Sequence, residues 1–259
     1  MSPVLFHKLR VAAVVAETAD SCSLVFDRPP ARADRFDYEP GQFLTLRVPG
    51  PDGPVARCYS LSSSPHADQQ LRVTVKRVDG GLASNWICDH VEPGSRLDVL
   101  EPAGTFTPRS LDEDLLLAAA GSGITPVLSI LTSALTAGNG RVVLLYANRD
   151  EQSVIFRERL VQLVEQHPER LSAVHWLESV QGLPSSAALQ ALVRPLSVDR
   201  AFVCGPRPFM GEVRTALREQ EFPRNRVHVE RFASLGGDPF VDAQPAEDAP
   251  EQSPADQTA

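Results

Sequence analysis

The sequence predicts two domains of different architecture, an antiparallel β-barrel followed by an α/β domain with a parallel sheet. Residues 1–110 contain short apolar segments with partial alternation, broken by turns rich in Pro and Gly, which is typical of antiparallel strands. Residues 111–233 instead alternate continuous apolar runs with segments of helical periodicity, which indicates parallel strands covered by helices. A chain of 259 residues is long enough to bury a core in each domain.

The first domain is expected to hold six strands and one helix. The strands are predicted at residues 7–15, 22–29, 42–50, 58–64, 71–78 and 95–102. Many short strands separated by Pro and Gly favour closure into a six-stranded antiparallel β-barrel. The helix is predicted at residues 80–91, where Gly80 and Gly81 precede a run with helical spacing.

The second domain is expected to be a Rossmann-like domain with a parallel sheet. Its strands are predicted at residues 114–121, 141–149, 171–179, 200–206 and 225–232. Helices are predicted between them at residues 125–138, 154–167, 185–193 and 209–220. Because a helix follows each strand except the last, we expect helices on both faces of one sheet.

The end of the chain differs in composition from both domains. Residues 234–259 are poor in apolar residues and rich in Pro, Ala and acids, so we expect a disordered linker or tail. Six of the 33 acids and none of the 25 Lys or Arg lie in residues 233–259, which leaves 27 acids against 25 cations elsewhere. A nearly neutral body gives no general reason to bind nucleic acid or a membrane, and neither is expected as a partner.

Composition also argues against a secretory leader, a membrane span and a metal site. Residues 1–20 include Lys8, Arg10 and Glu17 without an apolar core, and no apolar run approaches the ~18 residues needed to cross a bilayer. The four cysteines are widely separated, which suits reduced thiols and excludes a cluster built from local spacing. We therefore expect a cytoplasmic protein without a metal centre.

A cation, an aromatic ring and a hydroxyl stand close together at the start of the fourth predicted strand, as Arg57, Tyr59 and Ser60. Arg57 can hold phosphate oxygens, the ring of Tyr59 can stack on a flat heterocycle, and the Ser60 hydroxyl can bond a ring nitrogen. These three groups suit a flavin dinucleotide. The alternative is an exposed strand surface without a ligand.

Two glycine-rich turns are candidate phosphate sites. Residues Gly81 to Ser84 open the helix predicted in the barrel, after the cation Lys76, and free N–H groups at a helix N-terminus attract anions. Gly121 and Gly123 end the first strand of the second domain, and Pro126 suits the helical turn that follows. The third glycine of the usual dinucleotide fingerprint is absent after Gly123. For the turn at Gly81 to Ser84, the alternative is a plain helix N-cap without a ligand.

A short cysteine-containing segment lies at the C-terminal end of the fourth predicted strand of the second domain, as Cys204, Gly205 and Pro206. Open α/β sheets bind their ligands at this carboxyl edge of the strands, which makes the segment a candidate site. A buried structural cysteine is the alternative, because a thiol packs well among small apolar groups.

Seven short motifs occur in one order along residues 1–232, namely RCYS, GGLAS, PAGTF, GSGITP, YANR, CGP and VERF. In this order the sequence resembles the ferredoxin-NAD(P) reductase-like flavoprotein family. Within it the chain is most similar to the reductase components of bacterial oxygenases, of the 3-ketosteroid 9α-hydroxylase and phenylacetate-pathway type. The resemblance implies an FAD-binding barrel followed by an NAD(P)-binding α/β domain.

The resemblance also implies a role for individual residues. Those implied to bind FAD are Arg57, Cys58, Tyr59 and Ser60 at the flavin, Val75 and Lys76 at the ribityl phosphate, and Gly81, Leu82, Ala83 and Ser84 at the pyrophosphate. Those implied to line the nicotinamide dinucleotide are Gly121, Gly123, Thr125, Pro126, Asn148, Arg149, Cys204, Gly205 and Pro206. Phe232 is implied to close over the flavin, and the implied catalytic residues are Tyr59, Ser60, Cys204 and Glu230.

The implied activity is transfer of hydride from NADH onto FAD and of single electrons to an iron–sulfur protein that serves a terminal oxygenase. A flavin is needed because nicotinamide gives two electrons together, whereas a cluster accepts one. NADH is favoured over NADPH, which stays as the alternative, because Asp150 and Glu151 directly follow Arg149. Acids suit a free ribose diol better than a 2′-phosphate.

One departure from the family pattern is large. Reductases of this subgroup usually carry a plant-type ferredoxin domain with a C-x4-C-x2-C motif, and no such spacing occurs in these 259 residues. We therefore expect no iron–sulfur cluster in this chain, and either a truncated protein or a separate ferredoxin as electron acceptor. Two alternatives remain: a stand-alone ferredoxin or flavin reductase, and a non-catalytic regulatory module with the same fold.

Overall fold

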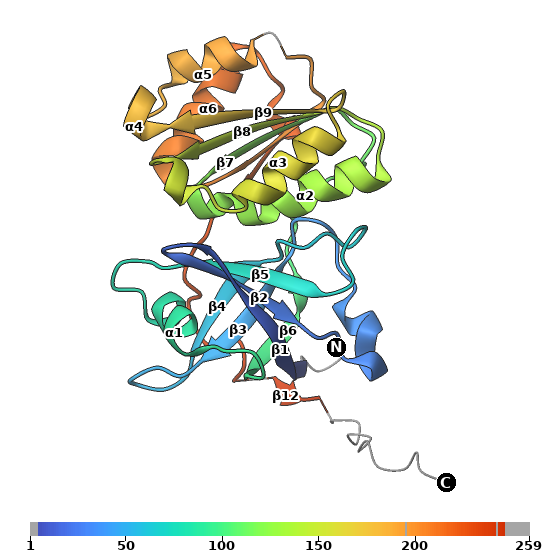
Figure 1. Ribbon diagram of the computed structural model, residues 1–259, viewed down its shortest axis with the longest axis vertical. Helices are drawn as coiled ribbons and strands as arrows, with labels where there is room; N and C mark the ends of the chain where they lie inside the picture. The colour runs from blue at the N-terminus through green and yellow to red at the C-terminus, as the bar shows by residue number, and fades with distance from the viewer. Residues whose placement is uncertain (1–4, 195, 242, 247–259) are drawn as a thin grey trace.

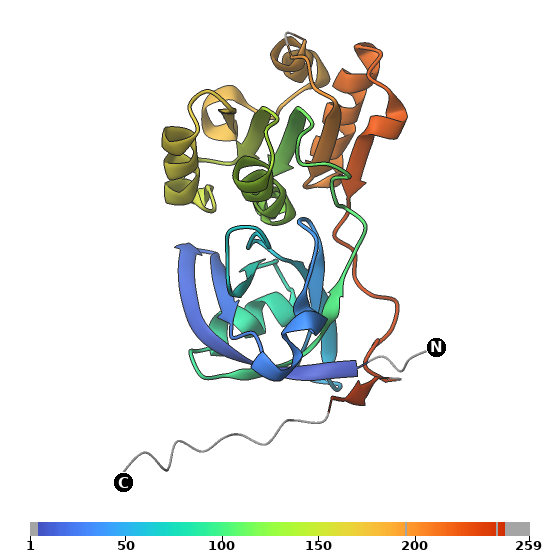
Figure 2. The same cartoon turned by 90° about the vertical axis from the view of Figure 1, so that its right-hand side faces the viewer.

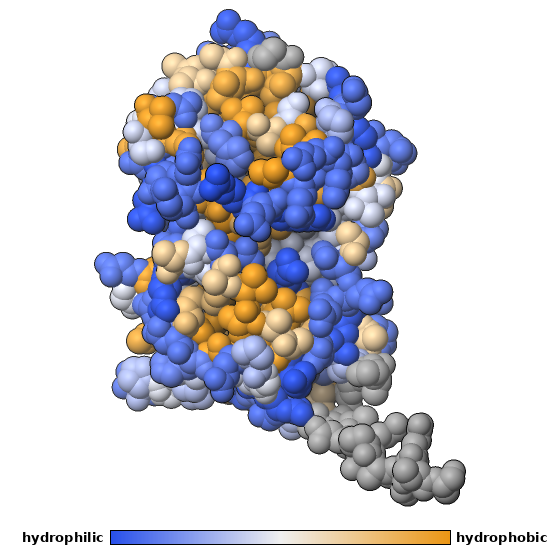
Figure 3. Space-filling view, viewed as in Figure 1, coloured by the Kyte–Doolittle hydropathy of each residue, from blue (hydrophilic) through white to orange (hydrophobic). Residues whose placement is uncertain are grey.

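The computed structural model describes residues 5–194, 196–241 and 243–246, which form two stacked domains (Figure 1). An antiparallel sheet makes up the lower domain, and a parallel sheet flanked by helices makes up the upper one. The predicted fold class is thereby confirmed. A crease separates the domains in the space-filling view, with hydrophilic side chains along much of its upper rim (Figure 3).

The lower domain contains the six predicted strands. They are β1 (Leu5–Thr18), β2 (Ser21–Phe26), β3 (Phe43–Val48), β4 (Val55–Ser60), β5 (Leu71–Lys76) and β6 (Arg96–Ala103). Their order in the sheet is β4-β3-β6-β1-β2-β5, and each neighbouring pair is antiparallel. An antiparallel bridge between Leu61 and Val73 joins the two ends of this order, which closes the sheet into a barrel.

The barrel interior is filled by apolar side chains that alternate along its strands. Leu24, Leu46 and Val73 are fully buried in it. Helix α1 (Leu82–His90) covers one end, because Ala83 and Ile87 lie four residues apart on one helix face and both pack into the barrel core. A 3-10 turn, η1 (Pro30–Phe36), which the sequence did not predict, adds Phe36 to the same core.

The upper domain contains the five predicted parallel strands. They are β7 (Leu115–Ala120), β8 (Val142–Asn148), β9 (Leu171–Leu177), β10 (Arg200–Cys204) and β11 (Val227–Glu230), in the order β11-β10-β7-β8-β9. The chain moves outward from β7 to β8 and β9 and then returns to the other side of β7. The order therefore reverses between β7 and β10, where open α/β sheets bind ligands at the carboxyl edge.

Helices cover both faces of the parallel sheet, as the sequence predicts. On one face α2 (Ile124–Ala137) and α3 (Arg157–Gln166) pack on Leu117, Leu144 and Tyr146. On the other face α5 (Ser186–Val193) and α6 (Arg207–Glu219) pack on Leu116 and Leu145. A short helix that the sequence did not predict, α4 (Glu178–Gln181), follows β9, and 3-10 turns η2 (Gly121–Gly123), η3 (Glu151–Ser153) and η4 (Arg224–Arg226) complete the domain.

Helix α2 fixes the upper domain on the barrel through buried hydroxyl groups. The Ser129 hydroxyl donates a 2.6 Å hydrogen bond to the carbonyl of Ser63, and the hydroxyls of Ser64 and Ser133 lie 2.8 Å apart. All four residues are at most 2 % exposed. Buried polar groups need hydrogen-bond partners, and here the buried serines of one domain find their partners in the other domain.

The segment after β11 corrects one prediction. Residues 234–246 were expected to begin a disordered tail, yet Phe240 is 3 % exposed and β12 (Gln244–Pro245) pairs in parallel with β1, as the seventh strand of the lower sheet. The Phe240 ring meets that of Phe6 edge-on at 5.9 Å, and the Arg47 guanidinium lies 4.6 Å from its centroid. One docked aromatic ring holds a segment whose average composition predicts disorder. Residues 247–259 lie outside the described residues.

The main chain passes between the domains twice, at residues 104–114 and at residues 231–239. Both passages run along the same side of the molecule (Figure 2). The β1–β2 hairpin rises toward the upper domain on the opposite side (Figure 2). No helix among the described residues is long and apolar enough to cross a membrane.

Candidate functional site

The ends of β7 and β10 meet at the point where the strand order reverses. A side chain at Gly123 would overlap the backbone carbonyl of Cys204, so only glycine permits this close approach. Gly121 has a left-handed backbone with φ of 53°, and open space surrounds the place of its missing Cβ. The two predicted motifs, GSG and CGP, therefore form one backbone-lined cradle of the kind that admits a dinucleotide.

The end of β8 adds a buried polar side chain to this cradle. Asn148 is 8 % exposed, and within the described part of the chain neither its amide nitrogen nor its amide oxygen has a hydrogen-bond partner. Two strands are tied together beside it, because the Tyr146 hydroxyl donates a 3.1 Å hydrogen bond to the carbonyl of Gly121. Burial raises the pKa of Tyr146, which keeps this hydroxyl a donor. An unpaired buried amide is costly in a folded protein and fits a ligand group at this place.

Helix α2 starts inside the cradle with the remaining predicted residues. The Thr125 hydroxyl caps the preceding turn by donating a 3.1 Å hydrogen bond to the carbonyl of Ser122. Pro126 lies in the first turn of α2, where it needs no N–H donor, and it is buried. The hydroxyl of Thr125 thus already has a partner within the turn. Thr125 would contribute to a ligand site by fixing the backbone of that turn.

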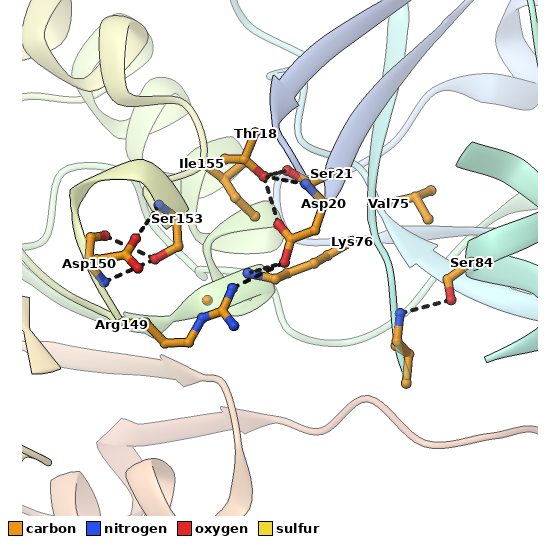
Figure 4. Close-up of polar contacts among 12 residues, drawn as sticks. Thr18, Asp20, Ser21, Val75, Lys76, Ser84, Arg149, Asp150, Ser153 and Ile155 are labelled. Atoms are coloured by element: carbon orange, nitrogen blue, oxygen red, sulfur yellow. Dashed lines mark hydrogen bonds and ion pairs between the residues drawn. The ribbon is translucent and has the colours of Figure 1, made fainter. Parts of the chain in front are cut away.

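Arg149 lies at the junction with the barrel rather than in the cradle. Its guanidinium donates a 3.3 Å hydrogen bond to the carboxylate of Asp20, in the turn between β1 and β2 (Figure 4). The ammonium group of Lys76 lies 3.5 Å from the same oxygen. Asp20 therefore links one predicted residue of each cofactor site, and it was not among the residues that the sequence singled out.

Asp150 is held just beyond Arg149 by a reciprocal cap. Its carboxylate accepts a 2.8 Å hydrogen bond from the backbone N–H of Ser153, whose hydroxyl accepts one of 3.1 Å from the Asp150 N–H (Figure 4). These bonds from Ser153 lower the pKa of Asp150. The carboxylate is therefore ionised and fixed in place beside the end of β8.

On the barrel side, the predicted flavin residues lie along β4. Tyr59 is half-buried against the barrel core, and this burial raises the pKa of its hydroxyl. Ser60 is buried, and Cys58 lies 3.5 Å from the Thr45 hydroxyl through its sulfur. Arg57 turns its guanidinium back to the carbonyl of Ala56, to which it donates a 2.7 Å hydrogen bond. Its remaining N–H donors are available to a phosphate.

The N-terminus of α1 supplies the second predicted part of the barrel site. Gly81 is the N-cap residue, and the Ser84 hydroxyl accepts a 3.1 Å hydrogen bond from the N–H of Val78 (Figure 4). A side chain at Gly81 would meet the Ser84 hydroxyl and Val78, so glycine is required here too. Ala83 is buried in the core, whereas Leu82 is 52 % exposed. Val75 is fully buried, so only its backbone can face a ligand.

Cys204 and Glu230 are neighbours in the register of β10 and β11. Burial raises the pKa of both groups, so the fully buried Cys204 sulfur stays protonated and neutral. Burial also raises the pKa of Cys58 on β4, and the Glu230 carboxylate at the end of β11 is a further cause of this rise. Gly205 and Pro206 continue from Cys204 into α6, and the Phe232 side chain is 53 % exposed.

A separate cavity lies on the outer edge of the upper domain, between α6 and β11. It measures about 650 Å³ and is lined by four arginines, Arg214, Arg218, Arg224 and Arg231. None of the residues predicted to bind a cofactor lines it. Alternation along β11 explains this, because Val229 and Arg231 face the cavity while Glu230 faces the opposite way.

The residues present fit the two cofactors that the fold implies. Two glycines that tolerate no side chain, an unpaired buried amide and an open helix N-terminus are all features that a bound dinucleotide would explain. Among the described residues, no group of three or more His, Cys, Asp or Glu could hold a metal ion.

Comparison with known families agrees with this division of the chain. Residues 8–107 match the family model of an oxidoreductase FAD-binding domain, and residues 117–215 match that of an oxidoreductase NAD-binding domain. The FAD/NAD-binding domain of nitric oxide dioxygenase from Vibrio cholerae superposes with a TM-score of 0.74 at 24 % identity, covering 88 % of this chain and 98 % of that one. This last likeness supports the fold.

Two curated proteins are similar over most of the chain. The ferredoxin reductase component of 3-ketosteroid-9-alpha-monooxygenase from Rhodococcus rhodochrous is 59 % identical over 240 residues, covering 92 % of this chain and 68 % of that protein. One component of the 1,2-phenylacetyl-CoA epoxidase from Escherichia coli is 35 % identical, covering 89 % of this chain and 69 % of that protein.

An FAD-binding barrel joined to an NAD-binding α/β domain defines a flavin-dependent oxidoreductase. The chain belongs to the ferredoxin-NAD(P) reductase-like flavoprotein family, and within it to the reductase components of bacterial oxygenases. It is an enzyme that uses FAD and NAD, and the family expected from the order of its motifs is confirmed.

Proposed function

We propose that the protein takes hydride from NADH onto FAD and delivers single electrons to a ferredoxin-type iron–sulfur protein, which serves an oxygenase acting on a steroid. The steroid rests on the name of the Rhodococcus relative, and an aromatic substrate is the second candidate because of the phenylacetyl-CoA enzyme. The observation that carries the reaction type is the meeting of the GSG and CGP turns at one sheet edge, next to β4 of the FAD domain.

FAD, when bound, accepts two electrons with a hydride and gives them up one at a time. The task of the protein is then to position the two ring systems and to exclude water. Arg57 would hold the phosphates of FAD with its remaining N–H donors, Tyr59 would support the flavin ring, and the buried Ser60 hydroxyl would bond its polar edge. The N–H groups of Gly81 to Ser84 would bind the pyrophosphate.

The nicotinamide would lie against the two turns that carry Gly123 and Cys204, which themselves are in contact. The protonated Cys204 sulfur would border it as a neutral surface, which avoids the side reaction of a nucleophilic thiolate with the oxidised nicotinamide ring. Glu230, beside Cys204, would close the same wall. No side chain needs to act as a general base, because the hydride carries its own electron pair. The Asn148 amide would find its missing partners on the dinucleotide.

The arrangement of charged groups near the end of β8 favours NADH over NADPH. A 2′-phosphate is bound best by free cations, but Arg149 is paired with Asp20, and the fixed carboxylate of Asp150 follows it. The same carboxylate suits the hydroxyls of an unmodified ribose as a hydrogen-bond acceptor.

An anaerobic titration of the purified holoprotein with NADH tests the first half of the proposal. The visible flavin absorbance should bleach at one equivalent of NADH, and kcat/KM should be higher for NADH than for NADPH. A plant-type [2Fe–2S] ferredoxin, added afterwards, should be reduced at the expense of the bleached flavin. Bleaching without ferredoxin reduction would reject the proposed acceptor, and absence of bleaching would reject the enzyme reaction.

A further inference from the structure

Two of the four free cysteines face each other across the barrel wall. The sulfur of Cys22, on β2, lies 3.5 Å from that of Cys88, on α1, although the residues are 66 positions apart. Both side chains are partly exposed. The other two, Cys58 on β4 and Cys204 on β10, belong to the site described above, so the pair is distinct from the cysteines of that site.

The surroundings of the pair make its two sulfurs unequal. The hydrogen-bond contact with the Cys22 thiol lowers the pKa of Cys88, and the nearby Arg77 guanidinium lowers it further. The same bond raises the pKa of Cys22. Arg77 is held in place by a 2.6 Å bond to Asp89, the residue after Cys88. Cys88 is therefore the sulfur that becomes a thiolate, and a thiolate is the reactive form.

We propose that Cys88 and Cys22 form a peroxide-responsive dithiol, in which Cys88 reacts with hydrogen peroxide and Cys22 then closes a disulfide. Hydrogen peroxide is named as the oxidant because reduced flavins release it when they react with O2. The site would thus respond to electrons that the flavin loses to oxygen, a use of these thiols that goes beyond the proposed function.

The steps balance without a further reactant. The Cys88 thiolate attacks one peroxide oxygen, the O–O bond breaks, and the departing hydroxide takes up a proton to give water. The Cys22 sulfur then attacks the sulfenic sulfur of Cys88, an S–S bond forms as the S–O bond breaks, and the Cys22 proton leaves with the hydroxide as a second water. Two thiols lose two electrons, and the peroxide is reduced to two waters.

The position of the pair gives oxidation a local consequence. Cys22 is paired in register with Val75, and the Cys88 sulfur lies 4.0 Å from the Val75 carbonyl. The disulfide would join β2 to α1. It would lie beside β5, which ends at Lys76, and α1 is the helix whose N-cap is Gly81. The cross-link would therefore fix α1 on the barrel next to the proposed pyrophosphate site.

The test uses the purified holoprotein, treated with hydrogen peroxide and then unfolded for thiol counting and peptide mapping. Four reactive thiols should fall to two, the Cys22 and Cys88 peptides should be linked, and dithiothreitol should restore all four. The matched control Cys58→Ser should lose two thiols in the same way. Four thiols after treatment, or a linkage to another cysteine, would overturn the proposal.

Two single variants test the separate roles of the sulfurs. Cys22→Ser should stop at the sulfenic acid, so that dimedone labels Cys88, whereas Cys88→Ser should give no label at Cys22. Labelling of Cys22 instead would overturn the assignment. Flavin content and flavin bleaching by NADH should match the wild type in both variants, which shows that they fold and separates failure of the dithiol from failure of the reductase reaction.

Discussion

Asp20 accepts a 3.3 Å hydrogen bond from Arg149 across the junction of the two domains, and the ammonium group of Lys76 lies 3.5 Å from the same carboxylate oxygen (Figure 4). The hairpin turn of the barrel thereby engages the cation that follows β8 of the upper domain. The Asp20 side chain thus contacts one residue from the proposed site of each cofactor.

Replacing Asp20 by Asn is expected to shift cofactor preference toward NADPH. The change frees Arg149 for a 2′-phosphate, so the ratio of kcat/KM for NADPH to that for NADH should rise. The pair is largely exposed, so the free energy of unfolding should change by no more than ~1 kcal/mol. Asp27→Asn, which removes a surface pair with Arg10 inside the barrel domain, is the control and should leave the ratio unchanged. An unchanged ratio in Asp20→Asn would contradict the role given to Arg149.

A methyl group at Gly123 is expected to abolish the dinucleotide cradle. In Gly123→Ala the new Cβ overlaps the Cys204 carbonyl, so the backbone must move, at a cost of about 1–3 kcal/mol in stability. Flavin reduction by NADH, followed by stopped-flow absorbance, should become much slower while FAD stays bound. Gly211→Ala is the matched control, since open space surrounds Gly211 within α6, and it should gain about 0.5–1 kcal/mol. Normal reduction rates in Gly123→Ala would count against the site.

The buried carboxyl group of Glu230 predicts a pH dependence of stability. Burial raises its pKa in the folded protein above the unfolded value of 4.5, so the folded state binds the proton more tightly. Stability from this group is present at low pH and is lost as pH rises through the folded pKa. Glu230→Gln should therefore unfold at a higher denaturant concentration than the wild type around pH 8, and at the same concentration below the unfolded pKa. Since Glu230 is partly exposed, the gain should stay below about 1 kcal/mol. If the denaturation midpoints of Glu230→Gln and the wild type were equal around pH 8 as well as at low pH, the raised pKa of Glu230 would be rejected.

Removal of the Phe240 ring is expected to release the segment that follows β11. Phe240→Ala loses the contacts with Phe6 and Arg47, and such buried truncations cost about 3–5 kcal/mol where the whole ring is enclosed. Limited proteolysis within residues 233–246 should become faster, and the melting temperature should fall. Val241→Ala is the control, because that side chain is 77 % exposed and should change neither. Undiminished resistance to protease in Phe240→Ala would show that other contacts hold the segment.

Most of the secondary structure was predictable because it depends on local periodicity. The continuous apolar runs of β7 and β8 and the helical spacing of α2 are visible in the sequence itself. The pairs Cys22–Cys88 and Asp20–Arg149 were not, because they join residues 66 and 129 positions apart in the chain. Only the register of β2 with β5 and the meeting of the domains bring them together.

The candidate site was predictable in part, for the same reason. Glycines that permit close approach are marked in the sequence, but the contact of Gly123 with the Cys204 carbonyl is visible only in the folded chain. Exposure is a property of the folded chain, so the motif alone does not give the 53 % exposure of the Phe232 ring, and its place over the flavin stays a prediction. Phe240 illustrates the reverse case, since a single buried ring outweighs the polar composition of the residues around it.

The two passages of main chain between the domains lie on one side, and the Asp20–Arg149 contact lies on the other, where the β1–β2 hairpin meets the upper domain (Figure 2). Between these two sides lie the buried hydrogen bonds from Ser129 to Ser63 and between Ser64 and Ser133. Any widening of the junction at the Asp20 edge would have to break these buried bonds as well as the exposed ion pair, so the buried serines set the resistance of the two domains to separation.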